Sequence, residues 1–177
     1  MESDEKLIQQ INDGDLDAFE TLYIRYRDWV YRLAYRFTRD EELAQDTVQE
    51  TFIYLLKKFP GFELTARMTT FLYPVVRFTA IGMLRQRQRH AGIGQPPEEI
   101  AIPAPENTDT SRRDLAAAMA VLPDPQRETV LMRFVDGFSI DEIAAALRIP
   151  AGTVKSRLHK ALQTLRKNEK TRRYFLE

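Results

Sequence analysis

The sequence predicts an all-α protein: two small helical domains joined by a flexible linker rich in proline and acidic residues, with a helix-turn-helix in the C-terminal domain. Apolar side chains recur every three to four residues along most of the 177-residue chain, as in amphipathic helices, and no segment alternates convincingly like a strand. The pattern breaks between residues 92 and 110, where four prolines and four acids occur without a base. Such a segment buries too little apolar surface to fold alone, so we predict an extended tether there.

The break divides the chain into an N-terminal domain at 1–91, the linker at 92–111 and a C-terminal domain at 112–177. Each domain is near the lower size limit for a self-sufficient core. Helices of the first domain are predicted over 17–37, 40–59 and about 70–90. Asp15 is placed to cap the first helix, and Pro60-Gly61 ends the second. The side chains of the second helix that are expected to face the core are Leu43, Val48, Phe52, Leu55 and Leu56.

The start of the third helix depends on Pro74. With Thr70 as the N-cap, Pro74 falls in the first turn, where its missing N–H matters little. A start before Thr70 would place the proline inside the helix and kink it. We expect the later start.

The C-terminal domain is predicted to hold helices at 112–121, 124–136, 140–147 and 151–170. Gly137 is expected to end the second of these with a positive φ. Ser139, with Glu142 three residues later, forms a capping box for the next helix.

The last helix has two different faces. Val154, Leu158, Ala161 and Leu165 recur at helical spacing and would face a core. The opposite side carries Lys155, Ser156, His159, Lys160 and Gln163. A helix fits the major groove of DNA, where Lys, Ser and Gln can bond base edges, while the flanking Arg157 and Arg166 could hold phosphates. The pattern alone is equally compatible with a surface helix that has a solvated basic face.

Composition narrows the classes of function. The 26 basic and 26 acidic residues cancel, which excludes a uniformly basic nucleic-acid coat. Nine bases against one acid over 148–173 suggest an anionic partner for the C-terminal half. The absence of cysteine excludes disulfides and thiolate chemistry, and His90 and His159 have no second metal ligand nearby. No segment is apolar enough to cross a membrane. We therefore expect a cytoplasmic protein without metal or cofactor, and an enzyme is the least expected class.

Three segments, in order, resemble the sigma factors of bacterial RNA polymerase, of the extracytoplasmic-function type. The C-terminal domain resembles the family's promoter-binding domain through QRETVLMRFVDGFSIDEIAAALRIPAGTVKSRLHKAL. Two earlier segments resemble the core-polymerase-binding helix, DTVQETFIYLLKKF, and the promoter-melting helix, TTFLYPVVRFTAIGMLRQRQR. With the linker, the likeness covers nearly the whole chain.

The resemblance implies residues for binding core polymerase. The acidic and amide cluster Asp46, Gln49 and Glu50 lies at i, i+3 and i+4, and in the family such a cluster grips a coiled coil of the largest subunit. Phe52 and Leu56 would add apolar contact. Standing alone, this helix would be read as an ordinary solvated polar face; the neighbouring segments favour the binding role.

For the minus-ten element, the resemblance implies Phe71, Arg77, Phe78, Arg85 and Arg89. Aromatic rings interleaved with arginines suit unpaired DNA, because bases stack on rings and arginines follow the backbone. Either phenylalanine could instead be core, Phe71 more readily than Phe78. The basic run that also includes Arg87 and His90 fits phosphate contact, or else a solubilising helix end.

At two positions this helix departs from the family, since many relatives carry Asn at the position of Phe78 and Asp at that of Gly82. Our hypothesis is that Phe78 replaces a hydrogen bond with stacking and relaxes minus-ten specificity.

For the minus-thirty-five element, the resemblance implies DNA contacts from the last helix, by Thr153, Lys155, Ser156, Arg157, His159 and Lys160. Arg148 occupies the corner of the helix-turn-helix, where the family usually has Gly. If that corner needs a positive φ, the arginine costs roughly 1–2 kcal/mol, which a phosphate contact could offset.

We therefore interpret the chain as an alternative sigma factor that binds the beta and beta-prime subunits of core RNA polymerase and directs initiation at promoter DNA. Its free form is expected to be a monomer. The short tail after Lys170 leaves no room for a sensory domain, so regulation is expected from expression level or a separate partner such as an anti-sigma factor.

Two rival interpretations remain open. A one-component helix-turn-helix regulator would form stable dimers and bind duplex DNA tightly without polymerase. A helical protein-interaction module would tolerate charge reversal of Lys155 and Lys160.

Overall fold

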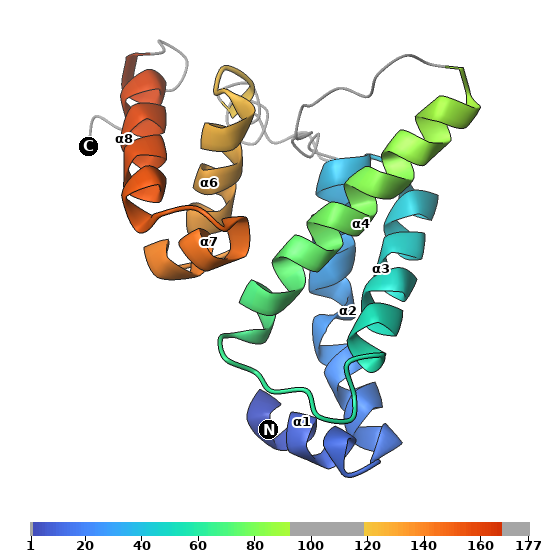
Figure 1. Cartoon of the computed structure of the whole chain (residues 1–177). Coiled ribbons are helices and arrows are strands. Elements are labelled where there is room, and N and C mark those ends of the chain that lie inside the picture. The colour runs from blue at the N-terminus through green and yellow to red at the C-terminus, as the bar shows by residue number, and fades with distance from the viewer. Residues whose placement is uncertain (1, 93–118, 168–177) are drawn as a thin grey trace, which may run out of the picture. The chain divides into compact units, whose positions relative to one another are not determined.

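The computed structural model describes residues 2–92 and 119–167, which belong to two compact units, 1–96 and 97–177 (Figure 1). Throughout these described ranges the regular secondary structure is α-helical, which confirms the predicted fold class. The predicted linker after its first residue, 92, and the predicted helix at 112–121 up to residue 118, lie outside the described residues.

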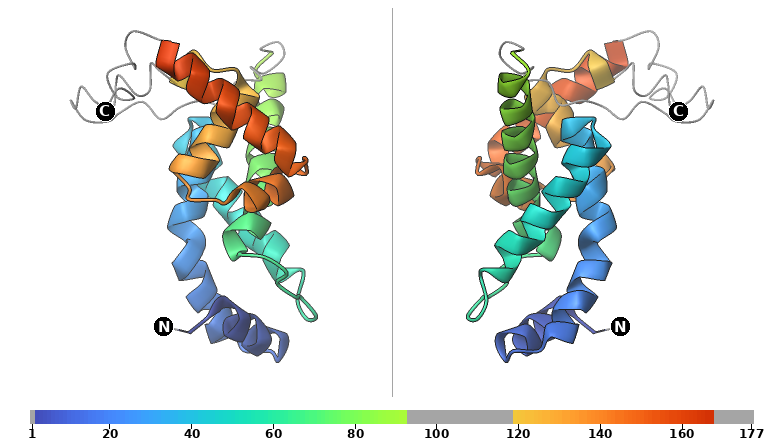
Figure 2. Two further views of the ribbon diagram at one scale, coloured as in Figure 1. Left: turned by 90° about the vertical axis from the view of Figure 1, so that its left-hand side faces the viewer. Right: turned by 90° about the vertical axis from the view of Figure 1, so that its right-hand side faces the viewer.

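The N-terminal unit is a three-helix bundle with a short helix across one end. Its elements are α1 (Asp4–Asn12), α2 (Leu16–Thr38), α3 (Glu41–Leu56) and α4 (Met68–His90). The last three pack against one another, successive helices running in opposite directions, and α1 packs on the start of α2 (Figures 1 and 2). Leu22, Leu33, Leu55 and Leu72 are fully buried between them.

Local signals fix the ends of α2 and α3. The Asp15 carboxylate accepts hydrogen bonds from the backbone N–H groups of Asp17 and Ala18, as predicted for an N-cap. Asp40 caps α3 by accepting from the Leu43 N–H at 3.0 Å. The helix ends at Leu56, before residue 59 where we expected it, and the side chain of Leu56 is 43% exposed rather than inward.

Our predicted start for α4 was wrong. The helix begins at Met68, which is fully buried together with Leu72 and Val76, so its first turn contributes to the core. Apolar burial at this four-residue spacing outweighs the local preference of Pro74, which lies inside the helix. Because proline has no N–H, the carbonyl of Thr70 loses its helical donor.

Sequence reasoning missed α1 altogether. The Ser3 side chain caps this helix by accepting a hydrogen bond from the Lys6 N–H. The helix buries Leu7, Ile8 and Ile11. The Asp4 carboxylate then accepts hydrogen bonds from Arg25 and Tyr26 of α2. Burial, helped by the Asp4 contact, raises the pKa of the Tyr26 hydroxyl above its usual value of 10.0, so the hydroxyl keeps the proton that it donates well into alkaline solution.

The last residue of α1 organises the loop that leads into α4. Asn12 Oδ1 accepts from the N–H groups of Gly61 (2.6 Å) and Phe62 (3.1 Å), and Asn12 Nδ2 donates to the Phe62 carbonyl at 2.9 Å. Phe62 is buried and its ring lies 4.8 Å, centroid to centroid, from that of Phe71 in α4. One side chain thus ties α1 to a segment some fifty residues later.

Asn12→Ala is therefore expected to destabilise the N-terminal unit by about 1–3 kcal/mol, because it leaves three backbone groups without their partner. Trp29 is the single tryptophan and lies in this unit, so urea unfolding followed by its fluorescence measures the loss. Asn12→Asp, which keeps the acceptor and loses the donor, should lie between the wild type and Asn12→Ala. Equal stability of Asn12→Ala and the control Gln9→Ala, an exposed position on α1, would contradict this role.

The C-terminal unit consists of α6 (Asp124–Phe134), α7 (Ile140–Leu147) and α8 (Ala151–Lys167). Its core joins Leu122, Val130, Leu131, Ala161 and Leu165. Both predicted turn signals are confirmed: Gly137 has a φ of 73°, and Ser139 and Glu142 form a complete capping box. α6 ends at Phe134, two residues before the predicted end at 136, and α8 is described to Lys167, short of the predicted residue 170.

Candidate interaction surfaces

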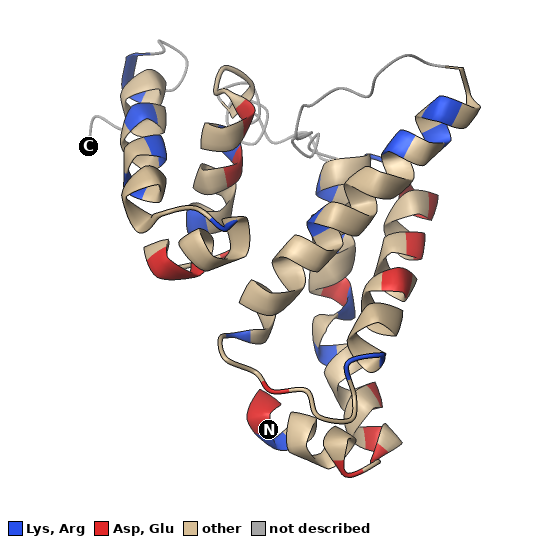
Figure 3. Cartoon of the chain, in the orientation of Figure 1, with Lys and Arg blue, Asp and Glu red and all other residues tan. Residues whose placement is uncertain are grey.

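The outward side of α3 presents a row of acids that continues into apolar side chains. Asp46, Gln49 and Glu50 are all exposed, as expected, and Figure 3 shows the acidic residues along this side of the helix. In the next turns Ile53 and Leu56 are 42% and 43% exposed. Positions 46, 49, 53 and 56 alternate spacings of three and four, so they form one stripe along the helix. We call Asp46, Gln49, Glu50, Ile53 and Leu56 the α3 face.

Phe52 lies inward, as the periodicity predicts, and therefore not on this face, where the resemblance implied an apolar contact with polymerase. Its side chain is 5% exposed and packs edge-on against Phe19 and Tyr23 of α2. The exposed apolar residues at this end of α3 are Leu56, Ile53 and its neighbour Tyr54. The spacing from Asp46 and Gln49 could have identified Ile53, because it lies seven and four residues after them.

A second surface runs along the outer side of α4. Phe78 is 82% exposed, and Gly82, Arg85 and Arg89 follow it at helical spacing, all exposed. These four residues are called the α4 stripe. A Cβ on Gly82 would touch nothing, so packing does not require the glycine there.

The other two residues expected to bind the minus-ten element lie differently. Phe71 is half-buried against Phe62 and faces the core side of the helix. Arg77 is also half-buried. Arg87, part of the basic run, pairs with Asp40, the N-cap of α3, and with Glu42 in its first turn rather than extending the stripe.

The two-faced character of α8 is confirmed. Val154, Ala161 and Leu165 are buried and Leu158 is half-buried, whereas the opposite side exposes Lys155, Ser156, His159, Lys160 and Gln163. Basic residues recur along this helix in Figure 3. His159 and Gln163 lie within hydrogen-bonding distance at 3.0 Å, and the side chains of Thr153 and Arg157 are half-buried.

The corner between α7 and α8 adopts the left-handed conformation, so the energetic cost expected for a positive φ at Arg148 applies. Arg148 has φ 54° and ψ 47°, and its N–H bonds back to the Ala145 carbonyl. A non-glycine residue in this region costs roughly 1–2 kcal/mol. Arg148 is exposed and precedes the first residue of α8 by three positions.

Within residues 2–92 and 119–167, no group of three or more His, Asp or Glu side chains could hold a metal ion. Over the same ranges, none of the helices combines the length and apolarity that a bilayer span requires.

Known protein families match both units. Residues 22–90 match the family described as Sigma-70 region 2, and residues 112–165 match Sigma-70, region 4. The chain is 30% identical to the ECF RNA polymerase sigma factor SigW of Bacillus subtilis, over 92% of this chain and 94% of that protein. It is 32% identical to the RNA polymerase sigma factor CarQ of Myxococcus xanthus, over 90% and 93%.

Solved structures share the fold. CnrH in complex with the cytosolic domain of CnrY matches with a TM-score of 0.67 at 20% identity, covering 92% of this chain and 94% of CnrH. The sigma factor RpoE of Bartonella quintana, solved with the anti-sigma factor NepR, matches with a TM-score of 0.63 at 24% identity, over 84% and 94%.

Proposed function

Because this chain belongs to the extracytoplasmic-function group of RNA polymerase sigma factors, we propose that each of its three exposed surfaces has its own task in promoter recognition. The chain binds core RNA polymerase and directs promoter-specific initiation, as a sigma factor does. Likeness to sigma factors over more than nine-tenths of the chain favours this function over a one-component regulator. Sigma factors are generally non-catalytic, and we extend that to this chain, which we place in the cytoplasm as a free monomer.

The α3 face is the proposed contact for core polymerase. The supporting observation is its composition: exposed acids and an amide lead into exposed Ile53 and Leu56 on a rigid helix. Its three-and-four spacing matches the 3.5-residue period of a coiled coil, so a basic coiled coil of the largest subunit could lie along it. The charged half would steer the encounter and the apolar half would bury area.

Asp46→Lys is expected to weaken binding to purified core polymerase by roughly tenfold, through repulsion of a basic partner and a slower association rate. Glu20→Lys, an equal charge change at an exposed position of α2, is the control. Titration of labelled chain with core polymerase measures both. Equal affinities for the two variants would remove the α3 face from the interface.

The α4 stripe is the proposed contact for the melted minus-ten strand. Phe78 supports this most, because a phenylalanine that is 82% exposed contributes almost nothing to folding in the free protein. Its ring is available to stack on an unpaired base, while Arg85 and Arg89 follow the strand's phosphates.

Phe78→Ala is expected to weaken binding of a single-stranded minus-ten oligonucleotide by the holoenzyme roughly 5- to 150-fold, the equivalent of about 1–3 kcal/mol of stacking. Phe134→Ala, which removes another exposed phenylalanine from the other unit, should leave this affinity unchanged. Phe78→Asn introduces the residue of many relatives and should narrow promoter choice. Unaltered open-complex formation and promoter choice in that variant would refute the stacking role.

The exposed side of α8 is the proposed reader of the minus-thirty-five element. Lys155, Ser156, His159 and Lys160 would face the major groove, with Thr153, Arg157 and Arg148 near the phosphates. RpoE of Bartonella quintana was solved with an anti-sigma factor, and we propose a partner of that class for this chain as well.

A further inference from the structure

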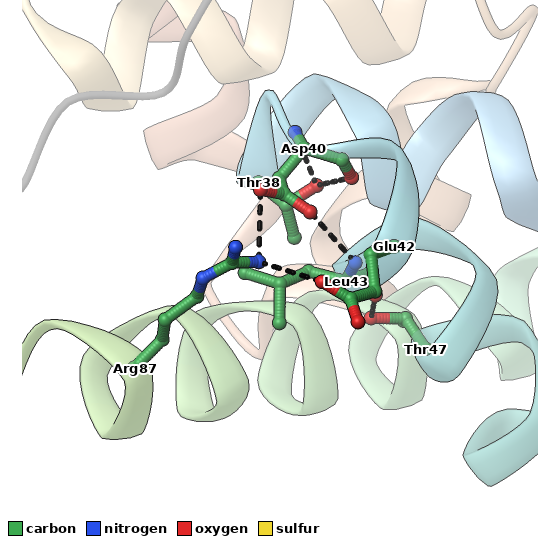
Figure 4. Close-up of polar contacts among 6 residues, drawn as sticks. All are labelled: Thr38, Asp40, Glu42, Leu43, Thr47 and Arg87. Carbon is green, nitrogen blue, oxygen red and sulfur yellow. Dashed lines mark hydrogen bonds and ion pairs between the residues drawn. The ribbon is translucent and has the colours of Figure 1, made fainter. Parts of the chain in front are cut away.

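Arg87 belongs to the basic end of α4 but is directed toward the protein. Its Nη1 lies 2.9 Å from Asp40 Oδ2 and 3.4 Å from Glu42 Oε2 (Figure 4). Two residues along a helix correspond to a rotation of about 200°, so Arg87 points away from the side that carries Arg85 and Arg89. The run of alternating arginines therefore has two sides with different surroundings.

The acids that hold Arg87 are parts of the first turn of α3. Asp40 is the N-cap, whose other oxygen accepts from the Leu43 N–H, and its own N–H donates to Thr38 Oγ1 at 3.3 Å. Close by, Thr47 Oγ1 donates to the Leu43 carbonyl at 2.7 Å and contacts Met83 Sδ of α4 at 3.6 Å. Figure 4 shows Arg87 reaching across from α4 to this capped turn. The position of Asp40 is fixed by the cap, so the ion pair has a rigid anchor.

We infer that Arg87 is a positioning residue for minus-ten binding: it ties the last turns of α4 to the start of α3 and so holds Arg85 and Arg89 toward the strand. The inference rests on the proposed function of the α4 stripe. A phosphate that recruited Arg87 would have to displace two carboxylates, whereas Arg85 and Arg89 bind without that exchange. The alternative role, direct phosphate contact by Arg87, makes opposite predictions for substitution of Asp40.

Asp40→Asn separates the two roles. Asparagine caps a helix as well as aspartate does, so the bond to the Leu43 N–H is kept while the nearer of the two charges that hold Arg87 is removed. The holoenzyme is titrated with a labelled single-stranded minus-ten oligonucleotide at several salt concentrations. Six variants are compared with the wild type: Arg87→Gln, Arg87→Lys, Asp40→Asn, the Arg87→Gln/Asp40→Asn double variant, Arg85→Gln and Phe78→Ala.

For a positioning role, Arg87→Gln and Asp40→Asn each weaken binding by about two- to fivefold, the range expected for a partly exposed ion pair. The double variant is no weaker than Arg87→Gln alone, because without the arginine the Asp40 charge has no contact left to lose there. Arg87→Lys restores part of the affinity. The salt dependence keeps its slope in these variants, while Arg85→Gln lowers it by about 0.7, as loss of one phosphate contact on a single strand requires.

A phosphate-binding role predicts the reverse. Asp40→Asn would then strengthen binding or leave it unchanged, and Arg87→Gln would lower the salt slope as Arg85→Gln does; this result overturns the inference. If the Arg85→Gln and Phe78→Ala holoenzymes also bind like wild type, the proposed role of the α4 stripe fails, and the inference fails with it. Loss of affinity in Arg85→Gln alone refutes only the positioning role.

Discussion

Arg127→Ala should unfold the C-terminal unit and leave the N-terminal unit folded. Arg127 is 5% exposed, and its guanidinium donates to four oxygens: the carbonyls of Met119, Ala120 and Leu122, at 2.8, 3.3 and 2.7 Å, and the Asp124 carboxylate at 3.0 Å. The arginine thereby holds residues 119–122, which precede α6, against the first turn of that helix. Removing one partner from a buried, charged network costs about 3–5 kcal/mol, comparable with the whole stability of so small a unit.

Peptide-resolved hydrogen exchange on the full chain measures this effect for each unit separately. We expect the amides of α6, α7 and α8 to lose protection while those of α2, α3 and α4 keep it. Arg127→Lys retains the charge but not the planar fork of donors, so it should be intermediate. Arg166→Ala is the control on an exposed site, where changes of about 0.5 kcal/mol or less are usual. Full protection of α8 amides in Arg127→Ala would show that this network does not hold the unit together.

The double substitution Lys155→Glu/Lys160→Glu should nearly abolish binding of the minus-thirty-five element. Both lysines lie on the exposed side of α8, opposite the buried Val154 and Ala161, so the substitutions leave the core intact. Each replaces an attraction to DNA by a repulsion. A good base contact contributes about 1–3 kcal/mol, so the pair should weaken binding of a minus-thirty-five duplex by roughly 100-fold or more.

Holoenzyme binding to that duplex, measured over a range of salt concentrations, tests the claim. The slope of log affinity against log salt should also fall by up to about two, since two phosphate-attracting charges are lost. Arg27→Glu with Arg32→Glu makes the same change in net charge on exposed positions of α2 and should have a far smaller effect. If the two double variants bind duplex equally well, α8 is a solvated surface, and the helical interaction module becomes the better interpretation of this unit.

Local sequence signals were sufficient wherever a single turn decides the structure. Asp15, Gly137 and the Ser139–Glu142 pair were predicted in their roles because each needs only neighbours within three residues. The faces of α8 were equally predictable, since its apolar residues occupy one side alone. These features made the helix-turn-helix, and the side of α8 on which its basic residues lie, predictable from the sequence.

Prediction failed where packing between distant segments decides. In α3 periodicity assigns both Phe52 and Leu56 to the inward side; Phe52 is buried, but Leu56 is 43% exposed. The helix α4 begins at Met68 because burial of that residue outweighs the preference of Pro74 for the first turn of a helix. The contact between Arg87 and Asp40 spans 47 residues and leaves no trace in the spacing of either.

The central claim is that this chain selects start sites only together with core polymerase. The most direct test is transcription by purified chain and core polymerase on a library of random upstream sequences, with the start sites sequenced. We predict initiation from a subset of templates that share two short elements, one lost with the Lys155→Glu/Lys160→Glu variant and the other altered by Phe78→Asn. The account is contradicted if no template initiates and the chain does not bind core polymerase.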